Sequence, residues 1–223
     1  MDEQSFVRWS QQAIAQHGFK LGNAIACVGV CRDELCRSLV WTVREDWGEA
    51  FNFSSLGGML TLGTSGFSAA HYHAPVVDGR ERYIYIVMPH IGISEEGEFG
   101  TCLREGRPGS SAACGALTAV REELLSGGLD LTLDRHNIEY SILKQHLAPR
   151  LKDKVPDMAA LTLIMSELIS DELERMIDLT VNKEIADYAV LTGVQIHRPL
   201  SGSLIWPNRR YIQVGGERHP LEF

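Results

Sequence analysis

The residues of this chain best suited to chemistry are two cysteines and a histidine that lie far apart in the sequence, Cys31, His90 and Cys114. Two thiolates and one imidazole suit Zn²⁺, a borderline-soft ion that prefers sulfur and nitrogen ligands. Three protein ligands leave the fourth tetrahedral position to water, which is typical of catalytic zinc and disfavours a purely structural ion. Because no C-x-x-C or H-x-x-x-H spacing supports the site, buried core thiols and a hydrogen-bonded structural histidine explain these residues equally well.

The other cysteines form no recognisable motif. The total of five is odd and the chain is long, which disfavours a disulfide framework. Cys27 falls inside a predicted strand and is expected in the core, whereas Cys36 and Cys102 are expected to be spectators in a helix and a polar loop. A thiol redox protein that uses Cys27, Cys31 and Cys36 is a rival hypothesis, but these spacings fit the C-x-x-C motif poorly.

Two predicted strands end beside candidate ligands. The run NAIACVGV predicts a buried, parallel strand that ends at Val30, directly before Cys31. The clearest strand of the chain covers residues 83–88, is apolar on both faces, and is followed by His90. Ligands gather at the carboxyl ends of strands in open α/β sheets, so these two side chains are expected at one edge of the sheet.

The third candidate ligand, Cys114, follows a long polar loop over residues 94–111. A helix is predicted from Ser111 or Cys114 to Leu125, ended by a pair of glycines. Free N–H groups and the helix dipole favour a thiolate at that position. Polar loops of this length inside a domain are usually functional or mobile.

The remaining pattern predicts a single α/β domain over 1–223, with a central, mostly parallel sheet flanked by helices and a late antiparallel hairpin. Its metal-site core is predicted at 23–127, and a helical segment with closing strands at 136–214. The further predicted elements are a helix over 4–17, a helix from Asp33 to Val43, a short strand over 51–53, a short helix within 57–75, helical structure over 136–188 with breaks at Pro149 and Pro156, and strands over 188–199 and 203–214 around a Ser201–Gly202 turn.

Composition excludes several classes of function. The formal net charge is −8 without a run of Lys or Arg, and an acidic surface repels the phosphate backbone of nucleic acids. No stretch approaches the roughly 18 uninterrupted apolar residues that a membrane span needs. The acidic, polar start MDEQSFVRWSQQ lacks the pattern of a secretory signal or a transit peptide, so a cytosolic location is expected.

Three segments together resemble a known family. CRDELCR, GRERYIYIVMPHIGIS and SSAACGAL are similar to the limiting-CO₂-inducible protein B family, β-carbonic-anhydrase-like proteins of which some are also called θ-carbonic anhydrases. The similarity runs from about Ala24 to Leu125 and continues more loosely into DYAVLTGVQIHRP. It implies a β-carbonic-anhydrase-like fold, a homodimer or higher homo-oligomer, and one Zn²⁺ held by Cys31, His90 and Cys114. It also implies a zinc lyase that hydrates CO₂ to bicarbonate with zinc-activated water.

The chain departs from ordinary β-carbonic anhydrases at the first ligand. These enzymes have a C-x-D-x-R run, and here Leu35 stands where the arginine belongs. Asp33 is predicted either to orient the attacking hydroxide or to close the site by ligating zinc. If Asp33 opens a helix, Arg37 lies at i+4, and we predict that it is the arginine that holds the carboxylate away from the metal.

Three residues in and near the segment AAHYHAP are candidates for supporting roles. His71 and His73 could carry protons out of the site, and Phe67 could line a CO₂ pocket, although all three could equally belong to an ordinary short helix. A catalytically weak or inactive zinc protein that binds CO₂ or bicarbonate, or serves as a subunit of an inorganic-carbon assembly, is the main alternative function. The same chemistry would also admit CS₂ or COS as a substrate.

Overall fold

A computed structural model describes residues 1–152, 154–199 and 202–222 of the chain. Its main sheet contains eight strands in the described residues: six follow the order β10-β9-β8-β4-β1-β2, while β3 pairs with β4 and β5 pairs with β8. The strands β1, β2, β4, β5 and β8 pair in parallel, and β9 and β10 add antiparallel partners at one edge. This is the predicted α/β class with a mostly parallel centre and a late hairpin. The strands are β1 Ile25–Gly29, β2 Ala50–Asn52, β3 Val76–Val77, β4 Arg80–Val87, β5 His90–Gly92, β6 Thr101–Leu103, β7 Ser110–Ala112, β8 Ala186–His197, β9 Ser203–Val214 and β10 Glu217–Pro220.

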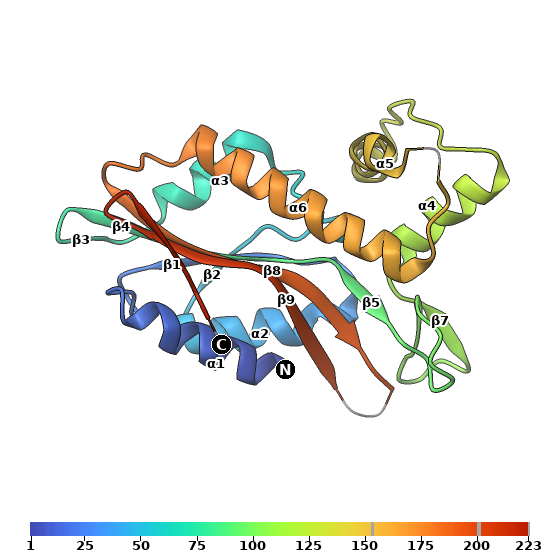
Figure 1. The fold of residues 1–223 in the computed structure, drawn as a ribbon, viewed down its shortest axis with the longest axis horizontal. Helices are drawn as coiled ribbons and strands as arrows, with labels where there is room; N and C mark the ends of the chain where they lie inside the picture. The colour runs from blue at the N-terminus through green and yellow to red at the C-terminus, as the bar shows by residue number, and fades with distance from the viewer. Residues whose placement is uncertain (153, 200–201, 223) are drawn as a thin grey trace.

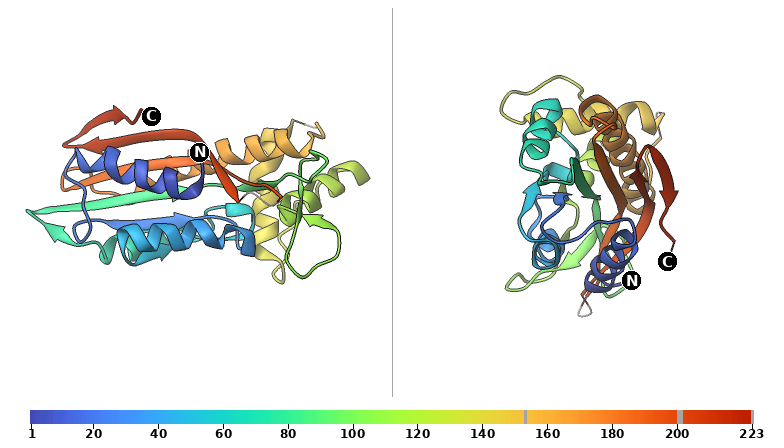
Figure 2. Two further views of the ribbon diagram at one scale, coloured as in Figure 1. Left: turned by 90° about the horizontal axis from the view of Figure 1, so that it is seen from below. Right: turned by 90° about the vertical axis from the view of Figure 1, so that its left-hand side faces the viewer.

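Helices cover both faces of the sheet (Figure 1). The helices α1 and α2 lie together on one face, and α3 and α6 lie on the other, as the two further views confirm (Figure 2). The helices α4 and α5 and the small hairpin of β6 and β7 lie beyond the end of the sheet toward which the parallel strands run. The helices are α1 Glu3–Ala15, α2 Arg37–Trp47, α3 Gly63–Tyr72, α4 Gly115–Ser126, α5 Ile138–Leu151 and α6 Met158–Thr180, with short 3₁₀ helices at Glu34–Cys36 and Leu56–Gly58.

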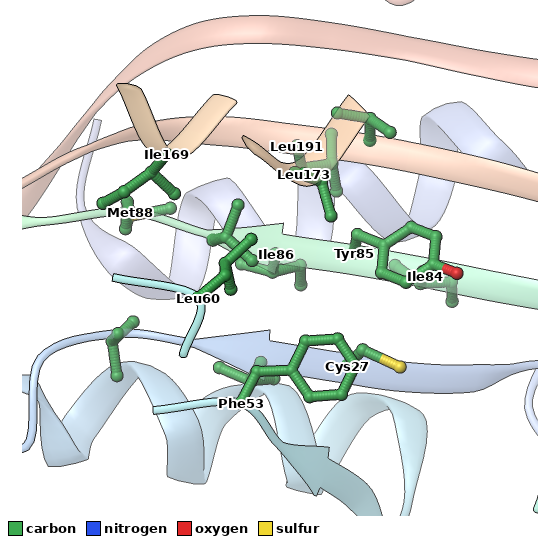
Figure 3. Packing of buried hydrophobic residues seen from close by; sticks show 14 of the residues in the cluster. Cys27, Phe53, Leu60, Ile84, Tyr85, Ile86, Met88, Ile169, Leu173 and Leu191 are labelled. Carbon is green, nitrogen blue, oxygen red and sulfur yellow. The ribbon is translucent and has the colours of Figure 1, made fainter. Parts of the chain in front are cut away.

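The central strand β4 forms the middle of the core (Figure 3). Its residues from Tyr83 onward are buried, because helices cover both faces of a parallel sheet and leave no solvent-facing side. Leu39 and Val43 of α2 are fully buried on one side of the sheet, and Ile169 and Leu173 of α6 on the other. Burial of each such side chain contributes about 1.5–3 kcal/mol relative to exposure.

Local signals explain where the first and last long helices begin. Asp2 caps α1 by accepting a hydrogen bond from the Ser5 N–H at 2.8 Å, and Asp157 caps α6 by accepting one from the Ala160 N–H at 2.7 Å. Aspartate favours both positions because its carboxylate satisfies a free N–H group and suits the positive end of the helix dipole. None of the helices in the described ranges is long and apolar enough to cross a membrane.

Three sequence-based boundaries were wrong. Pro149 lies inside the last turn of α5, which continues to Leu151, so the predicted break falls two residues too early. The polar loop over 94–111 contains the hairpin of β6 and β7, whose strands of three residues are too short to leave a periodic pattern. The helix predicted from Asp33 begins as a 3₁₀ turn, and α2 itself starts at Arg37. The hairpin of β8 and β9 confirms the predicted closing strands, while Ser201 of its predicted turn lies outside the described residues.

Candidate metal centre

Three separate elements bring Cys31, His90 and Cys114 to one point. Cys31 follows β1, and His90 starts β5 just after the neighbouring parallel strand β4 ends. Cys114 is the residue that precedes α4, in extended backbone conformation. The carboxyl ends of adjacent parallel strands therefore supply two of the side chains, and a helix N-terminus supplies the third, as the sequence predicted.

The ligand atoms of these three residues all lie within 4.8 Å of one another and all three residues are buried. The two Sγ atoms are 3.7 Å apart. Tetrahedral zinc with Zn–S bonds of about 2.3 Å would place its sulfur ligands about 3.8 Å apart, so the observed separation fits the ion. Within the described part of the chain, His90 Nε2 is buried without a hydrogen-bond partner, as a nitrogen reserved for a metal would be. Donor types and spacing thus fit Zn²⁺.

The two thiols share their protons unequally. The hydrogen bond between the two sulfur atoms lowers the pKa of Cys31 and raises that of Cys114, and burial raises the pKa of both. His90 also lowers the pKa of Cys31. One thiolate is therefore already favoured at neutral pH before any ion binds, and only one further proton has to leave when a metal takes both sulfurs.

Asp33 lies at the mouth of this group. It caps the 3₁₀ helix by accepting a hydrogen bond from the Leu35 N–H at 3.1 Å, and its Oδ2 is 3.8 Å from His90 Nε2. Arg104 binds the carboxylate through two N–H groups, each at 2.8 Å. Burial raises the pKa of the Asp33 carboxyl, but the hydrogen bonds from Arg104 and the Leu35 N–H, together with the nearby His90 and the charge of Arg104, bring it to about 2. The carboxylate is therefore ionised at neutral pH.

Arg104 is itself held from several sides. It follows β6, and its Nε donates to Ser111 Oγ at 2.7 Å while Nη2 donates to the Ala112 carbonyl at 2.8 Å. It also pairs with the more exposed Glu34. Its side chain is only 14% exposed, so the planar guanidinium is fixed in the position that suits a two-point bond to a carboxylate.

The prediction that Arg37 partners Asp33 was wrong. Arg37 is exposed, and the arginine bound to Asp33 is Arg104. The i+4 argument required both residues to lie within one α-helix, but Asp33 is the cap of a 3₁₀ turn with extended backbone, and α2 starts only at Arg37. A 3₁₀ turn advances by three residues rather than 3.6, which points Arg37 away from the cap.

Sequence reasoning missed Arg104 because it approaches from 71 positions along the chain. The signal available was a cation in the polar loop shortly before Cys114, and the loop offers two, Arg104 and Arg107. Leu35 shows that the arginine is not at its usual place in the C-x-D-x-R run. Only the folded hairpin of β6 and β7 shows that Arg104 takes its role beside Asp33.

His71, His73 and Phe67 lie away from the three ligands. His71 is buried, bonds Tyr85 Oη at 2.6 Å and stacks on Tyr83, and burial lowers its pKa. His73 is exposed beside Phe51, and Phe67 is fully buried with its ring 4.6 Å from that of Phe53.

The distance along β4 shows how far this aromatic group is from the metal centre. Four residues of extended strand, about 13 Å, separate Tyr83 from Val87, and His90 comes later still. His71, which contacts Tyr83, and His73, which lies beside Phe51, are therefore not brought to the site as the predicted proton carriers, and Phe67 packs in the core against Phe53 and Tyr85.

A second histidine lies behind the first. His197, at the end of β8, has its Nε2 3.1 Å from His90 Nδ1 and 3.9 Å from Cys36 Sγ. Burial and the neighbouring His90 lower the pKa of His197 to about 3, so its ring is neutral. Cys36 was expected to be a spectator, and the structure instead places it in this group behind the ligands.

Comparison with known proteins identifies the family. Residues 1–214 match the model of the family described as limiting CO₂-inducible proteins B/C, beta carbonic anhydrases. The chain belongs to this family. The solved structure of limiting CO₂-inducible protein LCIB shares 33% sequence identity with it, covers 100% of this chain and 93% of that chain, and superposes with a TM-score of 0.83. PtLCIB4, a homologue of LCIB, shares the fold at 23% identity and a TM-score of 0.87, over 100% of this chain and 95% of that chain. A comparison with curated proteins found no match.

Family membership and the geometry of the site both point to a possible zinc site of the β-carbonic-anhydrase kind. The family description names β-carbonic anhydrases, and this member carries a buried Cys–His–Cys group that fits zinc. The resemblance inferred from the three short segments is thereby confirmed over nearly the whole chain.

Proposed function

We propose that this member of the limiting-CO₂-inducible protein B/C family is a zinc-dependent carbonic anhydrase that reversibly hydrates CO₂ to bicarbonate. The observation that carries the proposal is the position of an ionised, arginine-bound carboxylate, Asp33, next to the buried group of Cys31, His90 and Cys114. The description of the family supports the same reaction. The zinc ligands would be Cys31 Sγ, His90 Nε2 and Cys114 Sγ.

Cys31, His90 and Cys114 would hold a zinc ion, which would supply Lewis acidity and lower the pKa of bound water toward neutral pH. The protein's own contribution is orientation. Asp33 is ionised and can only accept hydrogen bonds. It would accept one from the attacking O–H group, which turns a lone pair of that oxygen toward CO₂. Its Oδ2 lies 3.8 Å from His90 Nε2, close enough to reach a group bound beside that nitrogen.

Arg104 decides which of two roles Asp33 takes. A free carboxylate at this distance from the ligands would itself bind the ion and occupy the position that the nucleophile needs. The two-point bond from Arg104 satisfies both carboxylate oxygens and favours the orienting role. We therefore propose that Asp33 is the catalytic acceptor and Arg104 the positioning residue that keeps the site open.

The test is metal analysis combined with stopped-flow CO₂ hydration on wild type, Asp33→Asn and the control Arg37→Ala. Wild type is expected to hold one zinc per chain and to hydrate CO₂. Its rate should rise between pH 6 and 9, because two thiolates weaken the Lewis acidity of the ion relative to three histidines. Asp33→Asn should keep zinc and lose about 100-fold in rate, whereas Arg37→Ala should match wild type because its side chain is exposed and away from Asp33.

Two results would overturn the proposal in different ways. Zinc with no wild-type hydration at any pH would assign the chain to the alternative function, a zinc protein that binds CO₂ or bicarbonate without turnover. Absence of stoichiometric zinc would reject the metal centre itself.

We also propose that the chain forms a homodimer or higher homo-oligomer in the cytosol. An apolar groove supports self-association: it is lined by residues that include Phe99, Leu163 and Trp206, which are 52%, 56% and 65% exposed. Apolar patches of this kind on a water-soluble surface commonly mark contacts between proteins. Light scattering coupled to size exclusion is expected to give at least twice the 24.8 kDa chain mass, and a monomer at micromolar concentration would contradict the proposal.

A further inference from the structure

A chain of three polar side chains runs from the metal centre into the closing hairpin. His90 Nδ1 lies 3.1 Å from His197 Nε2, and His197 Nδ1 lies 2.8 Å from Ser203 Oγ. The three residues sit on the adjacent strands β5, β8 and β9, and His197 is the direct register partner of Ser203. The backbone pairing of three strands therefore sets the spacing of the side-chain bonds.

The protons on this chain can be arranged in one way if His90 Nε2 is to be a ligand. A neutral imidazole has one N–H, so a free lone pair on Nε2 places the hydrogen of His90 on Nδ1. That N–H must donate to His197 Nε2, which is then an acceptor. The neutral His197 ring carries its own hydrogen on Nδ1 and donates it to Ser203 Oγ. The bond to His197 thus fixes the tautomer of His90, and the bond to Ser203 fixes the tautomer of His197.

We propose that His197 and Ser203 are positioning residues that hold His90 in the tautomer and orientation that present Nε2 to zinc. The proposal rests on the Cys31, His90 and Cys114 centre put forward above. Metal-bound histidines usually donate their second N–H to a carboxylate, a carbonyl or water, and loss of that partner typically costs 10- to 100-fold in metal affinity. Here a neutral imidazole takes this place, which fixes the tautomer without adding negative charge beside two thiolates.

The alternative use of the same atoms is a metal site built from Cys36, His90 and His197, whose ligand atoms also lie within 4.8 Å of one another. That site would need His90 Nδ1 as the ligand and would leave the buried Nε2 facing the two other cysteines. The bond between His90 and His197 and its continuation to Ser203 favour the hydrogen-bonded arrangement. Cys36→Ala distinguishes the two arrangements. It removes a ligand of the alternative metal site but leaves the hydrogen-bonded chain of His90, His197 and Ser203 intact.

Four variants of the full chain test the proposal: His197→Phe, His197→Gln, Ser203→Ala and Cys36→Ala. Zinc affinity is measured by competition with a chromophoric chelator. His197→Phe keeps a ring but removes the acceptor, and we expect affinity to fall on the order of 10- to 100-fold. His197→Gln, whose amide oxygen can accept from His90 Nδ1–H, should recover most of the loss. Ser203→Ala should cause a smaller fall, and Cys36→Ala should stay within about twofold of wild type.

A second readout does not depend on bound zinc or on activity. In metal-free protein with ¹⁵N-labelled histidine, long-range ¹H–¹⁵N spectra distinguish the two tautomers of His90. Wild type and His197→Gln should show the Nδ1–H form, and Ser203→Ala or His197→Phe should show a mixture. This readout remains informative if wild type retains no zinc, a result that would reject the metal centre of the proposed function.

Two results would overturn the inference while leaving the proposed function intact. One is zinc affinity in a folded His197→Phe, or in Ser203→Ala if the first variant does not fold, that equals wild type. The other is a His90 tautomer that is the same in all variants. Loss of zinc in Cys36→Ala would instead support the alternative metal site and reject the proposed roles of His197 and Ser203.

Discussion

Two Asp–Arg pairs of similar geometry lie at opposite ends of the sheet and do different work. Asp33 and Arg104 meet beyond the carboxyl end of β1, where both oxygens of the carboxylate are bound at 2.8 Å. Asp187 and Arg80 meet where β8 and β4 begin, with contacts of 2.6 and 2.7 Å.

The surroundings of the two pairs differ more than their bonds. Asp187 is 2% exposed and also accepts from the Gly215 N–H, so its pair ties β4, β8 and the turn after β9 together. Asp33 lies 3.8 Å from His90 Nε2 at the edge of the candidate metal centre, and its arginine arrives on a short hairpin outside the main sheet. The geometry of a two-point Asp–Arg bond therefore does not show whether the pair has a structural or a functional role. What the carboxylate faces decides whether the pair supports the fold or the chemistry.

The largest expected effect is on stability, in Arg80→Ala. This change leaves the buried Asp187 carboxylate without its two-point partner, and removal of one member of a buried pair costs about 3 kcal/mol of unfolding free energy. Denaturant titration followed by fluorescence measures this loss. CO₂ hydration per folded, zinc-loaded molecule should remain at the wild-type level, and a parallel loss of hydration would erase the distinction between the pairs.

Arg104→Ala is expected to have the converse effect. Asp33 then lacks the cation that holds it away from the ligands, so it can move onto the metal, and we expect hydration to fall about 100-fold. The loss of unfolding free energy should be smaller than in Arg80→Ala, because the Asp33 side chain is 12% exposed, whereas that of Asp187 is 2% exposed. Stopped-flow rates normalised to bound zinc provide the measurement, with Arg37→Ala as the exposed control. Unchanged rates would remove Arg104 from the mechanism.

Arg104→Lys separates charge from geometry. Lysine keeps the positive charge but cannot make the planar two-point bond, and it loses the contacts to Ser111 and Ala112 as well. We expect hydration to fall about 10-fold, between wild type and Arg104→Ala. A lysine variant as active as wild type would show that charge alone holds the carboxylate.

The pair of Asp187 and Arg80 should make the unfolding free energy depend on pH in the acid range. Burial raises the pKa of the Asp187 carboxyl, but hydrogen bonds from Arg80 and Gly215 outweigh it and hold that pKa below its ordinary value. A carboxyl with a lowered pKa in the folded state adds stability that is complete above its unfolded pKa of about 4 and disappears as pH falls through the folded value. Wild-type unfolding free energy should therefore decline more steeply below pH 4 than that of Asp187→Asn. Equal slopes would contradict the assignment.

The smallest effect is expected from Glu34→Gln. Glu34 is 60% exposed and shares Arg104 with Asp33. Exposed ion pairs contribute at most about 1 kcal/mol, so hydration should change by less than about fivefold. A loss as large as that of Arg104→Ala would mean that Glu34, and not only Asp33, sets the position of the guanidinium.

Local sequence determined a large part of this protein. The apolar runs before Cys31 and His90 predict strands because residues buried on both faces of a parallel sheet must be apolar throughout, and β1 and β4 have that pattern. Strand ends and a helix start then supply the three candidate zinc ligands, and short motifs around them suffice to suggest the family.

Only the tertiary structure decided the hydrogen-bond partners of Asp33 and His90. Arg104 reaches Asp33 across 71 positions, and His197 reaches His90 across 107. A hydrogen bond depends on side-chain positions to within a fraction of an ångström, and no periodicity in the sequence records which hairpin folds over a site or which strand pairs beside it. Helix spacing therefore pointed to Arg37, four residues along the chain from Asp33, whereas the fold brings Arg104 to the carboxylate.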